Sequence, residues 1–315
     1  MMDGQERITV TFHDQLYDVT SFAQLHPGGA NLLQHSDGKE ICSLLSGSEA
    51  LDGKSHRHSA SAYRILRDYA VLRTIPTATN SLIDTSRPVV EQIAALKDRY
   101  WSWIHEPTCE SLRLFHSAGW ESLSRTKWYA VPLVWMPIIV LLNVGGWNDF
   151  RSEGNGYFTS LQWFVTTFLC GIFCWTLMEY VIHRYGFHWQ PSSNSPRLMA
   201  FHFILHGLHH KTPMDKDRLV FPPAIASLIV VLLFWLYKAC MPWSRCLIFS
   251  SGNLFGYICY DMMHYYLHHG EPAPGTYLHR LKKYHYNHHF NNQHQAYGIS
   301  SAIWDNVFGT VGSYQ

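Results

Sequence analysis

The stretch HGLHH, residues 206–210, follows an apolar run and is one of four such histidine groups in this chain of 315 residues. The others read HRYGFH from His183, HYYLHH from His264 and HYNHH from His285. Fourteen of the twenty-one histidines lie between His183 and His294. Imidazole is the commonest metal ligand and suits iron, zinc or copper. Because a tetrahedral zinc has too few positions for so many imidazoles, the sequence predicts two metals.

Spacing within the groups selects the candidate ligands. Residues three and four apart share one face of a helix, so HGLHH directs His206, His209 and His210 toward one point. HYNHH is expected to do the same with its three histidines. His183 and His188 are five positions apart, so on a regular helix they would point in different directions. Either a helix end lies between them or they bind different metals. The ten candidate ligands are His183, His188, His206, His209, His210, His264, His268, His285, His288 and His289.

Other polar residues of this region are candidates for orienting those ligands. Four histidines fall outside the set: His202, His269, His279 and His294. We interpret His202 as a residue that orients a ligand through a hydrogen bond. Glu179, one turn before His183, and Asp261, three residues before His264, are candidates for the same role. For both acids the alternative is a carboxylate that satisfies a helix end.

Four long apolar stretches accompany the histidine groups, at residues 128–147, 160–182, 221–240 and 244–263. Each approaches the roughly 20 residues that a helix needs to cross a bilayer core. The fourth is the weakest because it contains Asn253 and Asp261, and polar side chains inside a membrane are costly. Counting all four gives two helical hairpins that return the chain twice to its starting side. All the histidine groups then share one face with the N-terminal segment.

Charge supports this topology. The loop between the hairpins carries Arg184, Arg197, Lys211, Lys216 and Arg218, whereas the first short loop carries only Arg151. This is the positive-inside pattern, which predicts a cytosolic histidine face. The opening residues are too polar for a secretory signal peptide, so we expect the N-terminal segment to stay in the cytosol. A net charge of +1 gives no electrostatic case for nucleic acid.

The first third of the chain is more polar. Alternating Ile8, Val10 and Phe12 predict strand, and short helices are expected between residues 31 and 69, which makes a small α+β unit. A polar linker with two prolines follows at residues 74–88, and then apolar positions at helical spacing over residues 89–104. That helix either anchors in the membrane interface or is buried in a soluble domain. We therefore predict three regions: residues 1–73, 74–127 and 128–315.

The histidine groups, with their membrane helices, resemble the fatty acid hydroxylase superfamily of membrane di-metal enzymes. The likeness is carried by YVIHRYGFHW from Tyr180, FHFILHGLHHKTP from Phe201, YDMMHYYLHH from Tyr260, LKKYHYNHHF from Leu281 and WDNVFGT near the C-terminus. It covers roughly residues 84–310 and is closest to the fatty acid 2-hydroxylases. The resemblance implies a mostly α fold, with four transmembrane helices and a cytosolic di-metal cap. It also implies the same ten histidines as metal ligands.

The N-terminal unit resembles cytochrome b5. The likeness rests on HPGG at residues 26–29, which follows LYDVTSFAQL, and on His58, which opens HSASA. It implies a haem b with His26 and His58 as axial ligands. Two axial imidazoles leave no open position on the iron, so such a haem shuttles electrons. The segment between them is longer than usual, His56 competes as a ligand, and a domain that has lost haem is the alternative.

Together the resemblances imply a multi-pass monooxygenase of the endoplasmic reticulum membrane. It would hydroxylate carbon 2 of long-chain fatty acids, free or as acyl chains of ceramide and other sphingolipids. An NAD(P)H-dependent reductase would pass electrons through the haem to the di-metal centre, where O₂ reacts. Zinc cannot change oxidation state, so we expect iron for activity, with zinc able to occupy the site in purified protein. No side chain is expected to act as nucleophile or acid–base catalyst.

Two other interpretations remain open from the sequence. A related membrane desaturase or sterol oxidase uses similar histidine groups, and some desaturases carry an N-terminal cytochrome b5. In a different class, the chain would be a non-catalytic carrier of metal or haem in the membrane.

Overall fold

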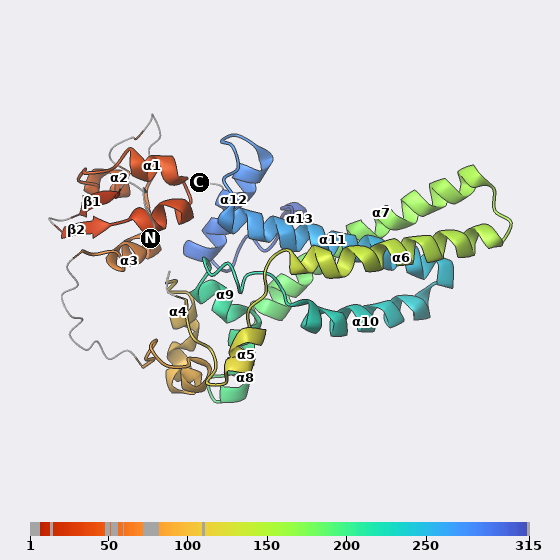
Figure 1. Ribbon diagram of the computed structural model, residues 1–315, viewed down its shortest axis with the longest axis horizontal. Helices are drawn as coiled ribbons and strands as arrows, with labels where there is room; N and C mark the ends of the chain where they lie inside the picture. Colours follow the sequence, from red (N-terminus) through yellow and green to blue (C-terminus); the bar gives the residue numbers. More distant parts are fainter. Residues whose placement is uncertain are drawn as a thin grey trace.

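A computed structural model describes residues 7–12, 15–47, 51, 56–58, 60–71, 82–108 and 111–313. Figure 1 shows a long bundle of helices, with the small N-terminal unit beside one end of it. The expectation of a mostly helical membrane protein with a small α+β unit is confirmed by this architecture. Most of the linker predicted at residues 74–88 lies outside the described residues.

The N-terminal unit forms the predicted α+β structure. Val10 and Tyr17 are paired across two antiparallel strands, and both are buried. Alternate residues of a strand share one face, so one face of this pair of strands points into the unit. Short helices cover this side of the strands and complete a small apolar core. The elements are β1 (Thr9–Phe12), β2 (Gln15–Asp18), the 3₁₀ helix η1 (Thr20–Leu25), α1 (Ala30–Gln34), α2 (Cys42–Ser46) and α3 (Ala60–Arg67).

The helix predicted after Pro88 forms in two pieces. A 3₁₀ helix η2 (Val90–Arg99) is kinked at Lys97, where φ is 44°, and α4 (Tyr100–Ile104) follows. The apolar residues of these two helices are buried against the side chains of Met199 and Phe203. This burial favours a helix packed inside the protein over one lying in the membrane interface.

The bundle consists of α6 (Ala130–Ser152), α7 (Tyr157–Val181), α10 (Pro223–Cys240) and α11 (Trp243–His269). The first three, with α7 continued to Phe187, are long and apolar enough to cross a membrane. They correspond to the first three predicted spans. The fourth prediction falls on α11, which is long enough but too polar to meet the same criterion among the described residues.

The position of α11 explains its polarity. It lies at the centre of the bundle against α6 and α7 (Figure 1). The helices touch so closely that a Cβ on Gly252 would lie 2.1 Å from the carbonyl oxygen of Phe168. Asn253 is buried there and donates a hydrogen bond to the carbonyl of Gly171 at 3.3 Å. The polar residues of α11 therefore face neighbouring helices, where a membrane protein tolerates them.

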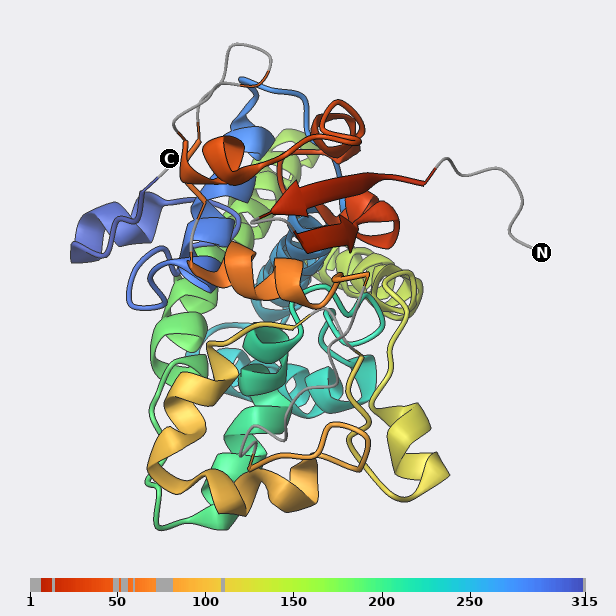
Figure 2. The ribbon, with the colours of Figure 1, turned by 90° about the vertical axis from the view of Figure 1, so that its left-hand side faces the viewer.

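A cap of short elements closes the bundle at the end where α7 and α11 finish (Figure 2). The N-terminal unit lies in front of this cap in that view, and its contacts run from α3 to α12 and from η1 to α11. The cap comprises α5 (Ala118–Leu123), the π-helical turns η3 (Ile182–Phe187) and η4 (Phe203–Gly207), α8 (Pro196–His202), α9 (Leu208–Lys211), α12 (Tyr277–Phe290) and α13 (Ile303–Phe308).

Candidate metal centre

The ten candidate histidines converge in the cap as two groups of five. In each group, one ring nitrogen per residue lies within 4.8 Å of all the others. Nine of the ten side chains are buried, and His188 is partly buried. We call the first group, His183, His188, His206, His210 and His288, cluster A. The second group, His209, His264, His268, His285 and His289, is cluster B.

The structure corrects one expectation from spacing. HGLHH does not aim its three histidines at one point, because His206 and His210 belong to cluster A while His209 belongs to cluster B. HYNHH divides likewise, with His288 alone in cluster A. Neighbouring helix positions point about 100° apart, whereas positions four apart nearly coincide in direction. Each motif therefore serves both clusters, and only its pair at positions one and five shares a cluster.

A π-helical turn brings His183 and His188 together. The backbone N–H of His188 donates to the carbonyl of His183 at 3.1 Å, a bond across five residues, where an α-helix would span four. This wider turn and the helix end after it place the two Nε2 atoms 3.2 Å apart. The helix end expected between these residues is present, and both belong to the same cluster.

The nitrogen separations suit metal ions. In cluster A the Nε2 atom of His188 lies 3.0–3.2 Å from those of the other four histidines. In cluster B three pairs of Nε2 atoms lie 2.8–3.0 Å apart: His209 with His264, His268 with His285, and His285 with His289. Metal–nitrogen bonds of about 2.1 Å that meet near right angles separate neighbouring nitrogens by about 3 Å. Each cluster therefore has the size and the donor atoms to hold one ion.

Protonation supports the same interpretation. Burial lowers the pKa of His209 to about 3, and burial together with neighbouring imidazoles lowers the pKa of His285 and His289 well below the usual value. The rings are therefore neutral near pH 7. Neutral imidazoles present lone pairs, and five lone pairs that face one another need a cation between them.

Two rings of cluster A are oriented by backbone carbonyls. His183 donates from Nδ1 to the carbonyl of Tyr297 at 2.6 Å, and His288 donates from Nδ1 to the carbonyl of Gln295 at 2.7 Å. A donated Nδ1–H fixes the tautomer and leaves the Nε2 lone pair for a metal. Sequence reasoning missed these carbonyls because a backbone acceptor has no signature in the residue type.

The three residues expected to orient ligands bond to the backbone instead. Glu179 accepts hydrogen bonds from the backbone of Ile299 and Ser300, in the segment that holds the carbonyl of Tyr297. His202 donates from Nε2 to the carbonyl of Phe187, next to His188 in sequence. Asp261 accepts from the backbone N–H of Phe221, before α10. Within the described residues, none of the three has a hydrogen bond to a histidine of either cluster.

His105 is a neighbour of cluster A that the sequence did not suggest. Its Nδ1 donates to the carbonyl of Trp101 at 2.8 Å, and its ring centroid lies 4.9 Å from that of His210. Its Nε2 is buried without a hydrogen-bond partner in the described residues. A lone histidine outside the four groups gave no sign of this position, which depends on α4 packing against α9.

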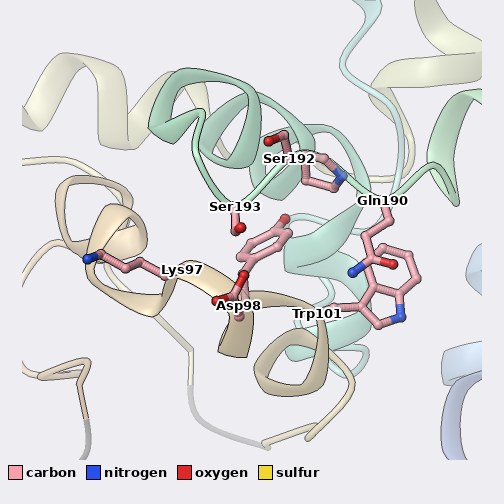
Figure 3. A pocket seen from close by; sticks show the side chains of 8 residues that line it. Lys97, Asp98, Trp101, Gln190, Ser192 and Ser193 are labelled. Atoms are coloured by element: carbon pink, nitrogen blue, oxygen red, sulfur yellow. The ribbon is translucent and has the colours of Figure 1, made fainter.

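A polar pocket of about 400 Å³ lies beside this region (Figure 3). Trp101 and Gln190 face each other on one side of it, with Lys97 and Asp98 on another. The Trp101 ring also packs on the rings of His105 and His202. The rings of Trp101 and His105 thus connect the pocket wall to His210 of cluster A.

The N-terminal unit contains a second pair of histidines that fits a cofactor. The rings of His26 and His58 face each other, with centroids 6.2 Å apart and planes inclined by 27°. His26 donates from Nδ1 to the carbonyl of Gly29 at 3.2 Å, so its Nε2 is free to bind iron. Burial, followed by the nearby His58, lowers the pKa of His26 to about 4. The ring centroid of His56 lies 4.9 Å from that of His58.

Comparison with known proteins agrees with both parts of this arrangement. Residues 168–310 match the family described as fatty acid hydroxylase, and residues 2–71 match the cytochrome b5-like haem/steroid binding domain. Fatty acid 2-hydroxylase of Macaca fascicularis is 38% identical over 94% of this chain and 89% of that protein. A dihydroceramide fatty acyl 2-hydroxylase of Arabidopsis thaliana is 43% identical over 73% of this chain and 93% of that protein.

A solved structure is also similar. It is described as full-length scs7p with only the hydroxylase domain visible, and its TM-score to this chain is 0.65 at 36% identity. The match covers 74% of this chain and 86% of that one. The ceramide very long chain fatty acid hydroxylase SCS7 of Saccharomyces cerevisiae is 32% identical over 96% of this chain and 89% of that protein.

Proposed function

The chain belongs to the fatty acid hydroxylase family, and from this premise we propose that it is a membrane monooxygenase acting on carbon 2 of long-chain fatty acyl groups. It is an oxidoreductase hydroxylase with a cytochrome b5-like domain. The names of its relatives include both fatty acid and ceramide hydroxylases, so the substrate class is a fatty acid or the acyl chain of a ceramide. They do not favour a desaturase, a sterol oxidase or a non-catalytic carrier.

The observation that carries the proposal is the pair of buried five-histidine clusters at the end of a membrane bundle. Their ten residues are the proposed ligands of a di-metal centre. When bound, a metal pair that changes oxidation state supplies the activation of O₂; zinc lacks that ability, so we propose iron. The chain itself holds ten neutral imidazoles in place and shields them from water by burial.

The bundle suits an acyl substrate. The outer faces of α6, α7 and α10 are apolar, with exposed side chains such as Leu141, Leu169 and Leu232. An acyl chain in the bilayer can therefore lie along the bundle while its carboxyl end approaches the cap. One oxygen atom of O₂ would enter the C–H bond, the other would leave as water, and NAD(P)H would supply the electron pair.

His26 and His58 are the proposed axial ligands of haem b, which would relay those electrons from a reductase. Support comes from the facing rings and from the contact between the N-terminal unit and the cap. α3 and η1 touch α12 and α11, the two helices that carry five of the ten proposed ligands. A haem bound there would lie in a unit that contacts the two helices carrying part of both clusters. We further propose that the unit and the cap face the cytosol at the endoplasmic reticulum membrane, as the basic residues around the cap suggest.

Product analysis tests the hydroxylase proposal. The protein is expressed in cells that lack 2-hydroxy lipids, and those lipids are measured by mass spectrometry. We expect 2-hydroxy acyl chains from the wild type, none from His288→Ala, and the wild-type amount from His279→Ala, a matched change on the same helix outside both clusters. Desaturated chains or altered sterols would contradict the hydroxylase, and bound metal without any product would favour a carrier.

Two further measurements test the cofactors. After the haem iron, measured by its absorbance, is subtracted, elemental analysis should find two metal ions per wild-type chain, and one alone would contradict the di-metal proposal. His26→Ala should lose the absorbance of bis-histidine haem while keeping both metal ions, and His56→Ala should keep the haem. Loss of haem from His56→Ala alone would exchange the roles of His56 and His58.

A further inference from the structure

We propose that Asp305 is a positioning residue for the metal of cluster A, acting through the peptide between Tyr297 and Gly298 and the imidazole of His183. This inference rests on the proposed function, because it takes cluster A as a metal site. It deepens that function by naming a carboxylate outside the ligand set that controls one of the two metals.

A single peptide unit joins the carboxylate to the ligand. The carbonyl of Tyr297 accepts the Nδ1–H of His183 at 2.6 Å. The N–H of the same peptide unit belongs to Gly298 and donates to Oδ2 of Asp305 at 2.8 Å. Hydrogen bonds in such a chain polarise one another, so a carboxylate on the N–H makes the carbonyl a stronger acceptor. A stronger acceptor at Nδ1 makes the Nε2 of His183 a better metal ligand.

Donors surround the carboxyl group of Asp305. Its Oδ1 accepts from the backbone N–H of Tyr297 at 3.0 Å and from the hydroxyl of Thr310 at 2.8 Å, in addition to the Gly298 bond on Oδ2. The side chain is fully buried. Burial raises the pKa of Asp305, and these hydrogen bonds oppose that rise by stabilising the carboxylate, which is the form that this role requires.

A similar chain of hydrogen bonds through one peptide unit orients His288. The carbonyl of Gln295 accepts the Nδ1–H of His288 at 2.7 Å, and the N–H of that peptide unit, on Ala296, donates to the carbonyl of Thr310 at 2.8 Å. We call residues 295–300 the strap. Two alternate peptides of the strap thus hold two ligands of cluster A, and both are tied to the segment from Asp305 to Thr310.

One face of α7 and of its continuation η3 contacts the strap and the segment that follows it. Thr176, Glu179, Tyr180 and His183 follow the spacing of one helix face. Thr176 accepts from the indole of Trp304, Glu179 accepts from two strap N–H groups, and the hydroxyl of Tyr180 contacts that of Thr310 at 2.9 Å. The same face therefore carries a proposed ligand and fixes the backbone that orients it.

The strap has little freedom to move. A Cβ on Gly298 would lie 2.0 Å from the carbonyl oxygen of Ser301 and 2.8 Å from Oδ2 of Asp305, so only glycine fits there. Ala296 is buried and has a φ of 61°, a left-handed conformation that a residue with a side chain adopts at a cost. The segment is held in this shape by the surrounding bonds.

Cluster B has a different environment. The Nδ1 atoms of His268, His285 and His289 are buried, and the described part of the chain offers them no hydrogen-bond partner, as it offers none to Nδ1 of His210 in cluster A. The hydrogen bonds of the strap to histidine rings go to His183 and His288, both in cluster A. A change at Asp305 should therefore reach one metal and spare the other.

Metal affinity tests this inference without depending on activity. Full-length protein is loaded with zinc and titrated with a competing chelator, and the zinc retained per chain is measured. We expect Asp305→Asn to weaken one of the two sites by about 10- to 100-fold, the usual effect of removing a group that supports a ligand. Asp261→Asn is the matched control, since it also removes a buried carboxylate that accepts a backbone N–H but lies away from the strap; both sites should stay tight.

Double variants identify the weakened site. Adding Asp305→Asn to His206→Ala, which already lacks a cluster A ligand, should not lower the zinc retained any further. Adding it to His285→Ala, which lacks a cluster B ligand, should weaken the zinc that remains. Equal weakening of both sites, or wild-type retention in Asp305→Asn, would overturn the inference.

If Asp305→Asn does not fold, Thr310→Val provides the second variant. It removes one donor to Asp305 and leaves the carboxylate in place, so we expect a smaller loss confined to the same site. A loss from cluster B in this variant would also overturn the inference. Zinc content of the wild type tests the di-metal proposal, and the difference between variant and wild type tests the strap, so the two failures are distinguishable.

Discussion

Clusters A and B are built from the same kind of ligand in different ways. Cluster B takes two i, i+4 pairs from the regular helices α11 and α12, and adds His209 from α9. Cluster A takes its histidines from η3 and the residue after it, η4, α9 and α12, and two of these elements are π-helical turns. Spacing along regular helices pairs four of the five ligands of cluster B. Cluster A in addition takes hydrogen bonds from the strap, at His183 on the irregular turn η3 and at His288 on α12.

The difference predicts unequal dependence on the rest of the chain. Cluster B is surrounded by packed helices and should tolerate changes in the C-terminal segment. Cluster A obtains the orientation of His183 and His288 from carbonyls of the strap, more than 100 residues from His183 in sequence. The longer the chain between a ligand and its support, the more the site depends on correct tertiary packing.

The largest expected effect separates two neighbouring residues of α12. His288→Ala should remove the cluster A metal and His289→Ala the cluster B metal, although the two side chains are adjacent in sequence. Each variant should retain one metal ion besides the haem iron, by elemental analysis, and yield no hydroxylated lipid, because the proposed reaction needs both ions. The combined variant should retain only the haem iron. If either single variant lost both ions, the clusters would not be independent sites.

A smaller effect is expected from Gly298→Ala. The added Cβ would collide with the carbonyl of Ser301, and overpacking of this kind costs about 1–3 kcal/mol. We expect a lower melting temperature and a weaker cluster A metal, measured by thermal unfolding and chelator titration. Gly119→Ala in α5 is the control, because its Cβ would meet only the hydroxyl of Ser117 at 3.7 Å. Weakening of cluster B in Gly298→Ala would remove the distinction between the clusters.

The smallest effect is expected from Tyr100→Phe. The hydroxyl of Tyr100 donates to Nδ1 of His202, whose Nε2 donates to the carbonyl of Phe187 beside His188. Removing one such bond costs about 0.5–1.5 kcal/mol, so metal affinity at cluster A should fall only several-fold. Chelator titration of the zinc-loaded variant measures it. If Tyr100→Phe lowered the metal affinity of cluster A as much as Asp305→Asn does, α4 would support this cluster at least as strongly as the strap.

Much of the fold was predictable because its signals are local. The apolar stretches that became α6, α7 and α10 have the length and hydropathy of membrane spans wherever they pack. The fourth stretch gave a weaker signal because α11 is covered by its neighbours, and a covered helix can carry Asn253 and other polar groups. Hydropathy reports contact with lipid, so it underestimates a helix at the centre of a bundle.

The ten histidines that gather could be selected from the amino-acid sequence, since their number, spacing and apolar surroundings are visible in it. Resemblance to cytochrome b5 pointed to His26 and His58, and the folded chain places their rings face to face. How the ten divide follows from tertiary packing, because the split of each HxxHH motif depends on which neighbouring helix each ring faces. The π turn at His188 and the carbonyls of the strap were likewise decided there, because backbone geometry and long-range contacts leave no mark in residue type.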